Sequence, residues 1–132
     1  MNIEITNLTT VPNDCLLSAP LDLTVGLKLE KPIKAGKWVI RFIFDFSFQK
    51  HSVVLLETQP KDYSAGESTE TFHIDSIDLS GLKEKELLNM GLLSASLFIE
   101  NETKNSALDI NMCTEITKEK DGYRRTILNP LE

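Results

Sequence analysis

The chain has 132 residues, of which 41% are hydrophobic, and a formal net charge of −6 at pH 7. This length fits one domain, and this hydrophobic content excludes a wholly disordered chain. The acidic balance disfavours direct binding to naked nucleic acid or to an anionic membrane surface, and it favours a basic protein partner. We therefore expect a single domain over residues 1–130, with residues 131–132 read as a vector-derived tail.

The N-terminus gives no sign of targeting. The first ten residues, MNIEITNLTT, have no basic start and no apolar run, so they do not resemble a secretory signal peptide. No segment approaches the roughly 20 apolar residues that a membrane-spanning helix needs. The two cysteines, Cys15 and Cys113, are then expected to stay reduced, as thiols do inside the cell. The sequence thus predicts an intracellular protein, nuclear or cytoplasmic.

Alternation of apolar and polar residues recurs along the chain and predicts β-strands, because successive side chains of a strand point to opposite faces. The clearest example is residues 21–30, LDLTVGLKLE. A break at residues 31–36 precedes the next strand, and residues 61–67 are expected to form a loop. Only residues 82–89 have a helical pattern, with Ser80 as the capping residue. The other strands predicted from this pattern cover residues 36–48, 51–58, 69–75, 93–99 and 108–116.

One short helix among seven or eight strands at hairpin-like spacing predicts an all-β fold. The architecture that we expect is an immunoglobulin-like β-sandwich with one short helix, or a partly open barrel. No internal repeat or linker divides the chain, so we expect one domain. We also expect the protein to be a monomer.

The strand GKWVIRFIFDFSF, residues 36–48, carries five of the nine aromatic residues of the chain on one face. That face could be a binding platform or part of the core. Five exposed aromatic residues would form a large apolar patch, whereas burying each contributes roughly 1.5–3 kcal/mol to stability. We therefore assign the stretch from Trp38 to Phe44 to the core. Phe46 and Phe48, at the end of the strand, are candidates for a partner contact.

Residues with catalytic or metal-binding chemistry are sparse. The chain has no glycine-rich phosphate loop, no CxxC or HExxH motif, and only two histidines. Cys113, His73 and Asp75 are residue types that could form a nucleophile and its base, but most proteins contain them. Asp62, Asp75 and Asp78 could line one end of a sandwich, as in calcium-binding domains, without the dense aspartate spacing of such loops. We expect no enzymatic activity, no metal and no cofactor.

The remaining expectation is a domain that binds through a sheet face or an edge strand. A binding face needs apolar residues where a strand otherwise presents polar ones. Val39 and Ile43 interrupt the polar side of the aromatic strand, and Leu92 precedes the outward Ser94 and Ser96. A neighbouring loop or the helix could instead cover each apolar residue, and both interpretations are open at this point.

Several stretches of the chain also match one known family in their order and spacing, although none is specific alone. They are MNIEITNLTTV, GKWVIRFIF, SAGESTETFHID, MGLLSASLFIE, ALDINMCTEI and DGYRRTILNP. Taken together, they resemble the Asf1 (anti-silencing function) histone chaperones over nearly the whole chain. The resemblance implies an elongated immunoglobulin-like sandwich that binds histone H3–H4 without catalysis.

The resemblance also implies a binding site. In the family, a histone H3 helix lies on a sheet face centred on valines of one strand and an arginine of the next. The matching positions are Leu92, Ser94 and Ser96 for the valine strand, Asp109 for the arginine, and Met112 and Cys113 for an adjacent tyrosine pair. Among these six candidate protein-binding residues, only Leu92 keeps the apolar character of the family's valine strand. A second family site is acidic, and the matching turn, residues 34–37, is basic.

These departures leave two binding functions open. One is a histone H3–H4 chaperone with a changed contact face. The other is an adaptor in a non-chromatin assembly, for example cytoskeletal or ciliary, that uses the same scaffold. A third interpretation, a lipid-binding sandwich, would require the aromatic strand to line a cavity.

Overall fold

The computed structural model describes residues 3–12, 15–46, 49–76, 91–100, 105–120 and 122–130, with the side chains of residues 44–46 and 49–51 excepted. Within these ranges the regular structure is entirely β. The strands are β1 (Ile3–Val11), β2 (Cys15–Leu16), β3 (Leu21–Leu29), β4 (Ile33–Phe46), β5 (Gln49–Glu57), β6 (Lys61–Tyr63), β7 (Gly66–Ile74), β8 (Gly91–Phe98), β9 (Leu108–Glu119) and β10 (Gly122–Ile127).

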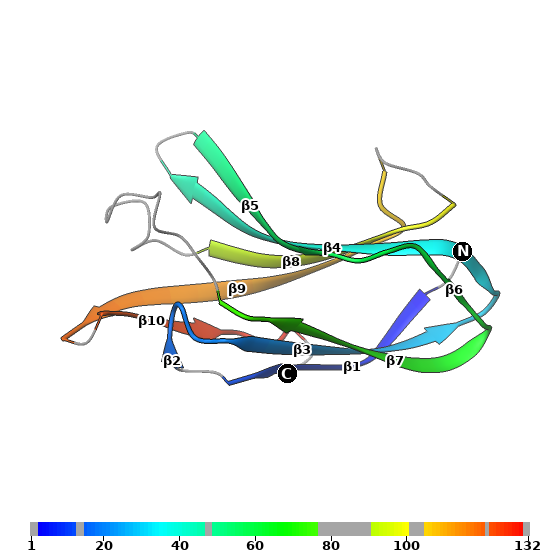
Figure 1. The fold of residues 1–132 in the computed structure, drawn as a ribbon, viewed down its shortest axis with the longest axis horizontal. Helices are drawn as coiled ribbons and strands as arrows, with labels where there is room; N and C mark the ends of the chain where they lie inside the picture. The colour runs from blue at the N-terminus through cyan, green and yellow to red at the C-terminus, as the bar shows by residue number, and fades with distance from the viewer. Residues whose placement is uncertain are drawn as a thin grey trace.

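The strands form two antiparallel sheets that pack face to face (Figure 1). The smaller sheet has the order β1-β3-β7, and the larger sheet has the order β2-β10-β9-β8-β4-β5, with β6 paired to β4. The all-β prediction is confirmed, and an immunoglobulin-like β-sandwich is consistent with this arrangement. The predicted helix over residues 82–89 lies outside the described residues. None of the described residues belongs to a helix long and apolar enough to cross a membrane.

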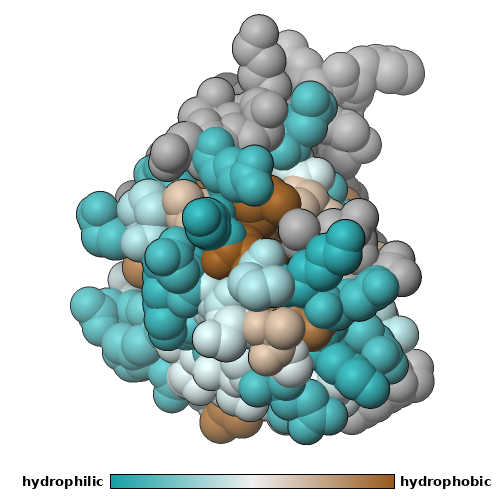
Figure 2. Space-filling model, turned by 90° about the vertical axis from the view of Figure 1, so that its right-hand side faces the viewer, coloured by the Kyte–Doolittle hydropathy of each residue, from teal (hydrophilic) through white to brown (hydrophobic). Residues whose placement is uncertain are grey.

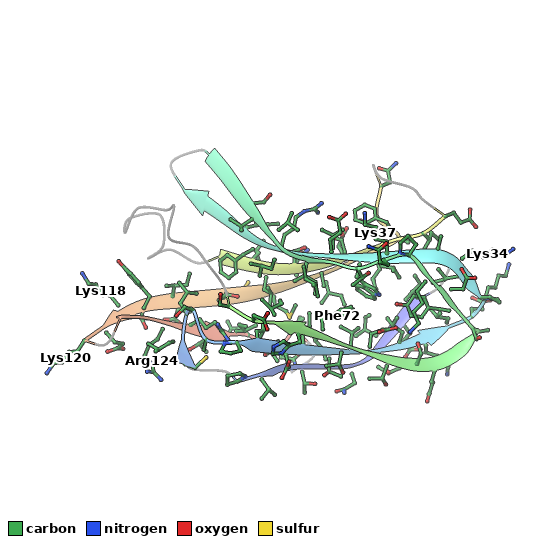
Figure 3. The ribbon with its side chains drawn as sticks, viewed as in Figure 1. Lys34, Lys37, Phe72, Lys118, Lys120 and Arg124 are labelled. Atoms are coloured by element: carbon green, nitrogen blue, oxygen red, sulfur yellow. The ribbon has the colours of Figure 1, made fainter. Side chains whose placement is uncertain are left out.

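The core lies between the sheets and contains the aromatic strand. Trp38, Ile40 and Phe42 of β4 are fully buried, as predicted. The Trp38 ring packs at 5.4 Å from the ring of Phe72 on β7, which projects between the sheets in Figure 3, and its Nε1 donates a hydrogen bond of 3.2 Å to the Tyr63 hydroxyl. The first part of the aromatic face is therefore interior. The side chains of residues 44, 46 and 48 lie outside the description.

The break expected at residues 31–36 is shorter than predicted, because residues 30–32 separate β3 from β4 and residues 33–36 already belong to β4. The strand already begins at Ile33, and its register with β6 shifts between Ile33 and Gly36. Ala35 has a φ of 52°, and its N–H donates a 2.9 Å hydrogen bond to the Asp62 carboxylate. A side chain at Gly36 would lie 2.9 Å from the Tyr63 ring. The loop predicted over residues 61–67 is wrong at both ends, because residues 61–63 form β6, which pairs with β4, and β7 begins at Gly66.

A buried arginine fixes the connection between β2 and β3. Arg125 of β10 has no exposed surface, and its guanidinium donates to the backbone carbonyls of Leu17 at 2.6 Å, Ala19 at 2.9 Å and Pro20 at 3.0 Å. Desolvation lowers the pKa of Arg125, although arginine stays charged at any physiological pH. These bonds satisfy three carbonyls that regular strand pairing leaves without partners.

Candidate protein-binding surface

Alternation along β8 defines the two faces of the larger sheet. Leu93, Ala95 and Leu97 point into the core and have no exposed surface. The residues between them face outward, because successive side chains of a strand alternate. We call the side of this sheet opposite the core the outer face. Its centre is β8, with β4 on one side and β9 on the other.

Five of the six predicted site residues lie on the outer face. Leu92 is half-buried, and Asp109 and Cys113 of β9 are exposed. Ser94 and Ser96 also face outward, but only 6% and 4% of their surface is exposed. The two serines therefore offer a partner little contact area.

The prediction for Met112 is wrong. Met112 is 1% exposed and belongs to the hydrophobic core. The physical reason is the period of two along β9, which puts residues 109 and 112 on opposite faces of the strand. Matching both to one binding face conflicted with the alternation of the chain itself. Cys113, next in sequence, takes the outward position.

The Asp109 carboxylate is held by two serine hydroxyls. Ser96 donates a 2.7 Å hydrogen bond to Oδ1, and the Ser106 hydroxyl lies 2.8 Å from both carboxylate oxygens. These contacts join β8 to the start of β9. Asp109 thus presents a fixed negative charge to solvent, at the position where the family resemblance would place an arginine.

An apolar row crosses the outer face from strand to strand. Ile43 on β4 lies opposite Leu92, and Leu92 lies opposite Cys113 on β9. The row continues with Leu128, which comes directly after β10. The N–H of Leu128 donates a 2.8 Å hydrogen bond to the Cys113 carbonyl, and 49% of the Leu128 surface is exposed. We call Ile43, Leu92, Cys113 and Leu128 the apolar row. Leu128 was missed in the sequence, because nothing predicted the strand before it.

Outside the apolar row, the described outer face carries both signs of charge and two further apolar side chains. These are Val54 of β5, opposite Arg41 and 53% exposed, and Phe98 of β8, opposite Lys37 and half-buried. Arg41 and Asn111 flank Ser94 in the next row of the sheet. Farther along, Lys37 of β4 pairs with Glu57 of β5, and this ion pair lowers the pKa of Glu57. Val39 is nearly buried, so of the three apolar interruptions noted in the sequence it contributes least.

A pocket of about 620 Å³ opens at one end of the sandwich. Figure 2 looks onto this end and shows a hollow with hydrophobic residues at its base and hydrophilic residues around it. The lining residues are Ile3, Glu4, Lys28, Leu29, Glu30, Ala107 and Leu108. Leu108 pairs with Leu97, so the pocket and Leu92 lie toward opposite ends of β8.

The structure does not bring the candidate catalytic residues together. Cys113 is on the outer face of the larger sheet, whereas His73 is exposed on the outer side of the smaller sheet. Asp62, considered for a calcium site, accepts the Ala35 N–H, and Asp78 lies outside the described residues. In the described part of the chain, no group of three or more histidine, cysteine or acidic residues could hold a metal ion.

No family model matches the chain, and no curated protein matches it.

Proposed function

We propose that this protein is a non-enzymatic protein-binding module that holds its partner on the outer face of the larger sheet. The observation that carries the proposal is the apolar row, in which Ile43, Leu92, Cys113 and Leu128 lie side by side across β4, β8, β9 and the end of β10. Soluble domains generally cover contiguous apolar surface with another element or a partner. Polar residues border the row, as they border the apolar centre of protein interfaces.

The partner that we propose is histone H3–H4. Two features of the sequence support it: the ordered stretches that resemble the anti-silencing function family, and the net charge of −6, which attracts a basic partner. The row retains Leu92 on β8, the strand at the centre of the outer face. Contacts through Cys113 and Leu128 would replace the larger side chains that the family presents.

Titration of the protein with an H3–H4 dimer, followed by calorimetry at low and at physiological salt, tests this proposal. We expect one-to-one binding with a submicromolar Kd that survives physiological salt, because apolar burial is not screened. Binding that is absent, or that vanishes when salt is raised, would mean only charge attraction and would overturn the histone assignment.

A second candidate function is an adaptor in a non-chromatin assembly. The observation that favours it is Asp109, whose carboxylate is fixed by Ser96 and Ser106 where a histone-binding arginine would be expected. A face altered in this way suits a different partner. The location of the tagged protein in its own cells separates the two: exclusion from the nucleus would favour the adaptor, and nuclear enrichment would count against it.

A further inference from the structure

A histidine between two carboxylates lies on the opposite side of the molecule from the apolar row. His73, near the end of β7, pairs directly with Asp22 at the start of β3. Its Nδ1 is 2.6 Å from an Asp22 carboxylate oxygen, and its Nε2 is 2.9 Å from a carboxylate oxygen of Asp75. Both ring nitrogens therefore face acceptors.

The number of protons on the ring decides whether both contacts can exist. A neutral imidazole has one N–H donor and one acceptor nitrogen, whereas the protonated ring has two donors. Two ionised carboxylates accept only, so both contacts are hydrogen bonds only when the ring is protonated. We propose that His73 is a proton-operated clasp that links the start of β3, the end of β7 and Asp75, where the chain leaves the smaller sheet.

The charges around the ring favour the closed state. Asp22, from β3, and Asp75, directly after β7, are the two charged groups that act on it, and the hydrogen bond from Asp22 makes the largest contribution to the raised pKa of His73. From β1, the neighbour of Asp22 is Val11, which carries no charge. A raised pKa in the folded state means that the clasp contributes stability at acidic pH and loses it as pH rises through that pKa.

Asp75 is the contact that opens first. Its side chain is 96% exposed, whereas that of Asp22 is 51% exposed and lies on a regular strand. When the ring loses a proton, the remaining one stays on Nδ1 toward the closer carboxylate of Asp22. The lone pair of Nε2 then faces the Asp75 carboxylate and repels it. The neutral ring is therefore expected to be the Nδ1–H tautomer.

Nitrogen-15 NMR of the two histidine rings, recorded while the pH is raised, tests the clasp directly, because ring nitrogen shifts report both protonation and tautomer. We expect the pKa of His73 in the folded protein to exceed its value in the urea-unfolded chain, with the Nδ1–H tautomer above it. Asp22→Asn should lower this pKa more than Asp75→Asn. Glu67→Gln is the matched control: Glu67 faces the same side of β7 but lies six residues away, about 20 Å along the strand, where the charge is screened.

Two results would overturn the proposal. One is a pKa of His73 that is equal in the folded and unfolded chains, or unchanged by Asp22→Asn. The other is a neutral ring with its proton on Nε2, which would leave Asp75 rather than Asp22 as the retained partner. The NMR measurement needs no binding partner, so its outcome is independent of the proposed function.

Discussion

Arg125 occupies a position where a charge is costly. Its side chain has no exposed surface, and its guanidinium is satisfied by three backbone carbonyls. Among the described residues it forms no ion pair with a carboxylate, and its Nε has no hydrogen-bond partner. A buried charge is tolerated only where hydrogen bonds replace its hydration. Arg125 therefore orders the β2–β3 connection at the expense of its own desolvation.

Replacement of Arg125 by methionine tests this role. Arg125→Met keeps an unbranched side chain but removes every donor, so the carbonyls of Leu17, Ala19 and Pro20 lose their partners. Hydrogen bonds from charged donors contribute about 1.5–3 kcal/mol each, partly offset here by the removed desolvation, so we expect a loss of about 2–4 kcal/mol in the free energy of unfolding. Urea denaturation measures it.

The neighbouring arginine supplies the control for that experiment. Arg124 is half-buried on the other face of β10, and Arg124→Met should cost less than about 1 kcal/mol, as is usual near the surface. Equal effects of the two substitutions would show that the cage of carbonyls around Arg125 contributes nothing specific.

At the scale of elements, alternation predicted the long strands and the faces of β3 and β8 correctly, because a period of two survives wherever one face is buried. It could not reveal β2, which has two residues and hence no period. It also missed β10, GYRRTI, because Arg125 occupies a core position, whereas a charged residue is normally expected to face solvent. The alternation pattern does not show which strands pair with one another. The apolar row could therefore be identified only from the structure, in which Leu128 lies beside Cys113.

Alkylation of Cys113 tests the apolar row as one surface. Cys113 is exposed and lies between Leu92 and Leu128, so a bulky thiol adduct should obstruct a docked partner. In a Cys15→Ser variant treated with N-ethylmaleimide, we expect H3–H4 affinity to fall at least about tenfold, equivalent to 1.4 kcal/mol. Mass spectrometry verifies the single adduct, and calorimetry gives the affinity.

The complementary variant controls for reagent effects. Cys113→Ser retains Cys15, which is half-buried beside β10, away from the row. The same treatment should leave its affinity unchanged. If the Cys113 adduct binds as tightly as untreated protein, the row does not lie in the interface.

At the scale of the whole molecule, three features lie in different places on the sandwich. The apolar row lies on the outer face of the larger sheet, the His73 clasp lies on the outer face of the smaller sheet, and the pocket opens at one end. The protein core between the sheets keeps them apart. A substitution on one face can therefore test one feature without direct contact with the others.

The same substitution made at two sites, Leu92 within the apolar row and Val11 outside it, gives the most direct test of docking on the outer face. Val11 is 59% exposed on the outer side of the smaller sheet, opposite Asp22, so Val11→Arg introduces an arginine in place of an exposed aliphatic residue away from the apolar row. Leu92→Arg introduces it within the row. Circular dichroism establishes that both variants keep the β fold.

We would measure the affinity of H3–H4 for the wild-type protein and these two variants by calorimetry at physiological salt. The prediction is that Val11→Arg binds like wild type and that Leu92→Arg loses at least about tenfold in affinity, because a charge buried in an apolar contact is left without a partner. An affinity of Leu92→Arg equal to that of the wild-type protein would contradict docking on the apolar row.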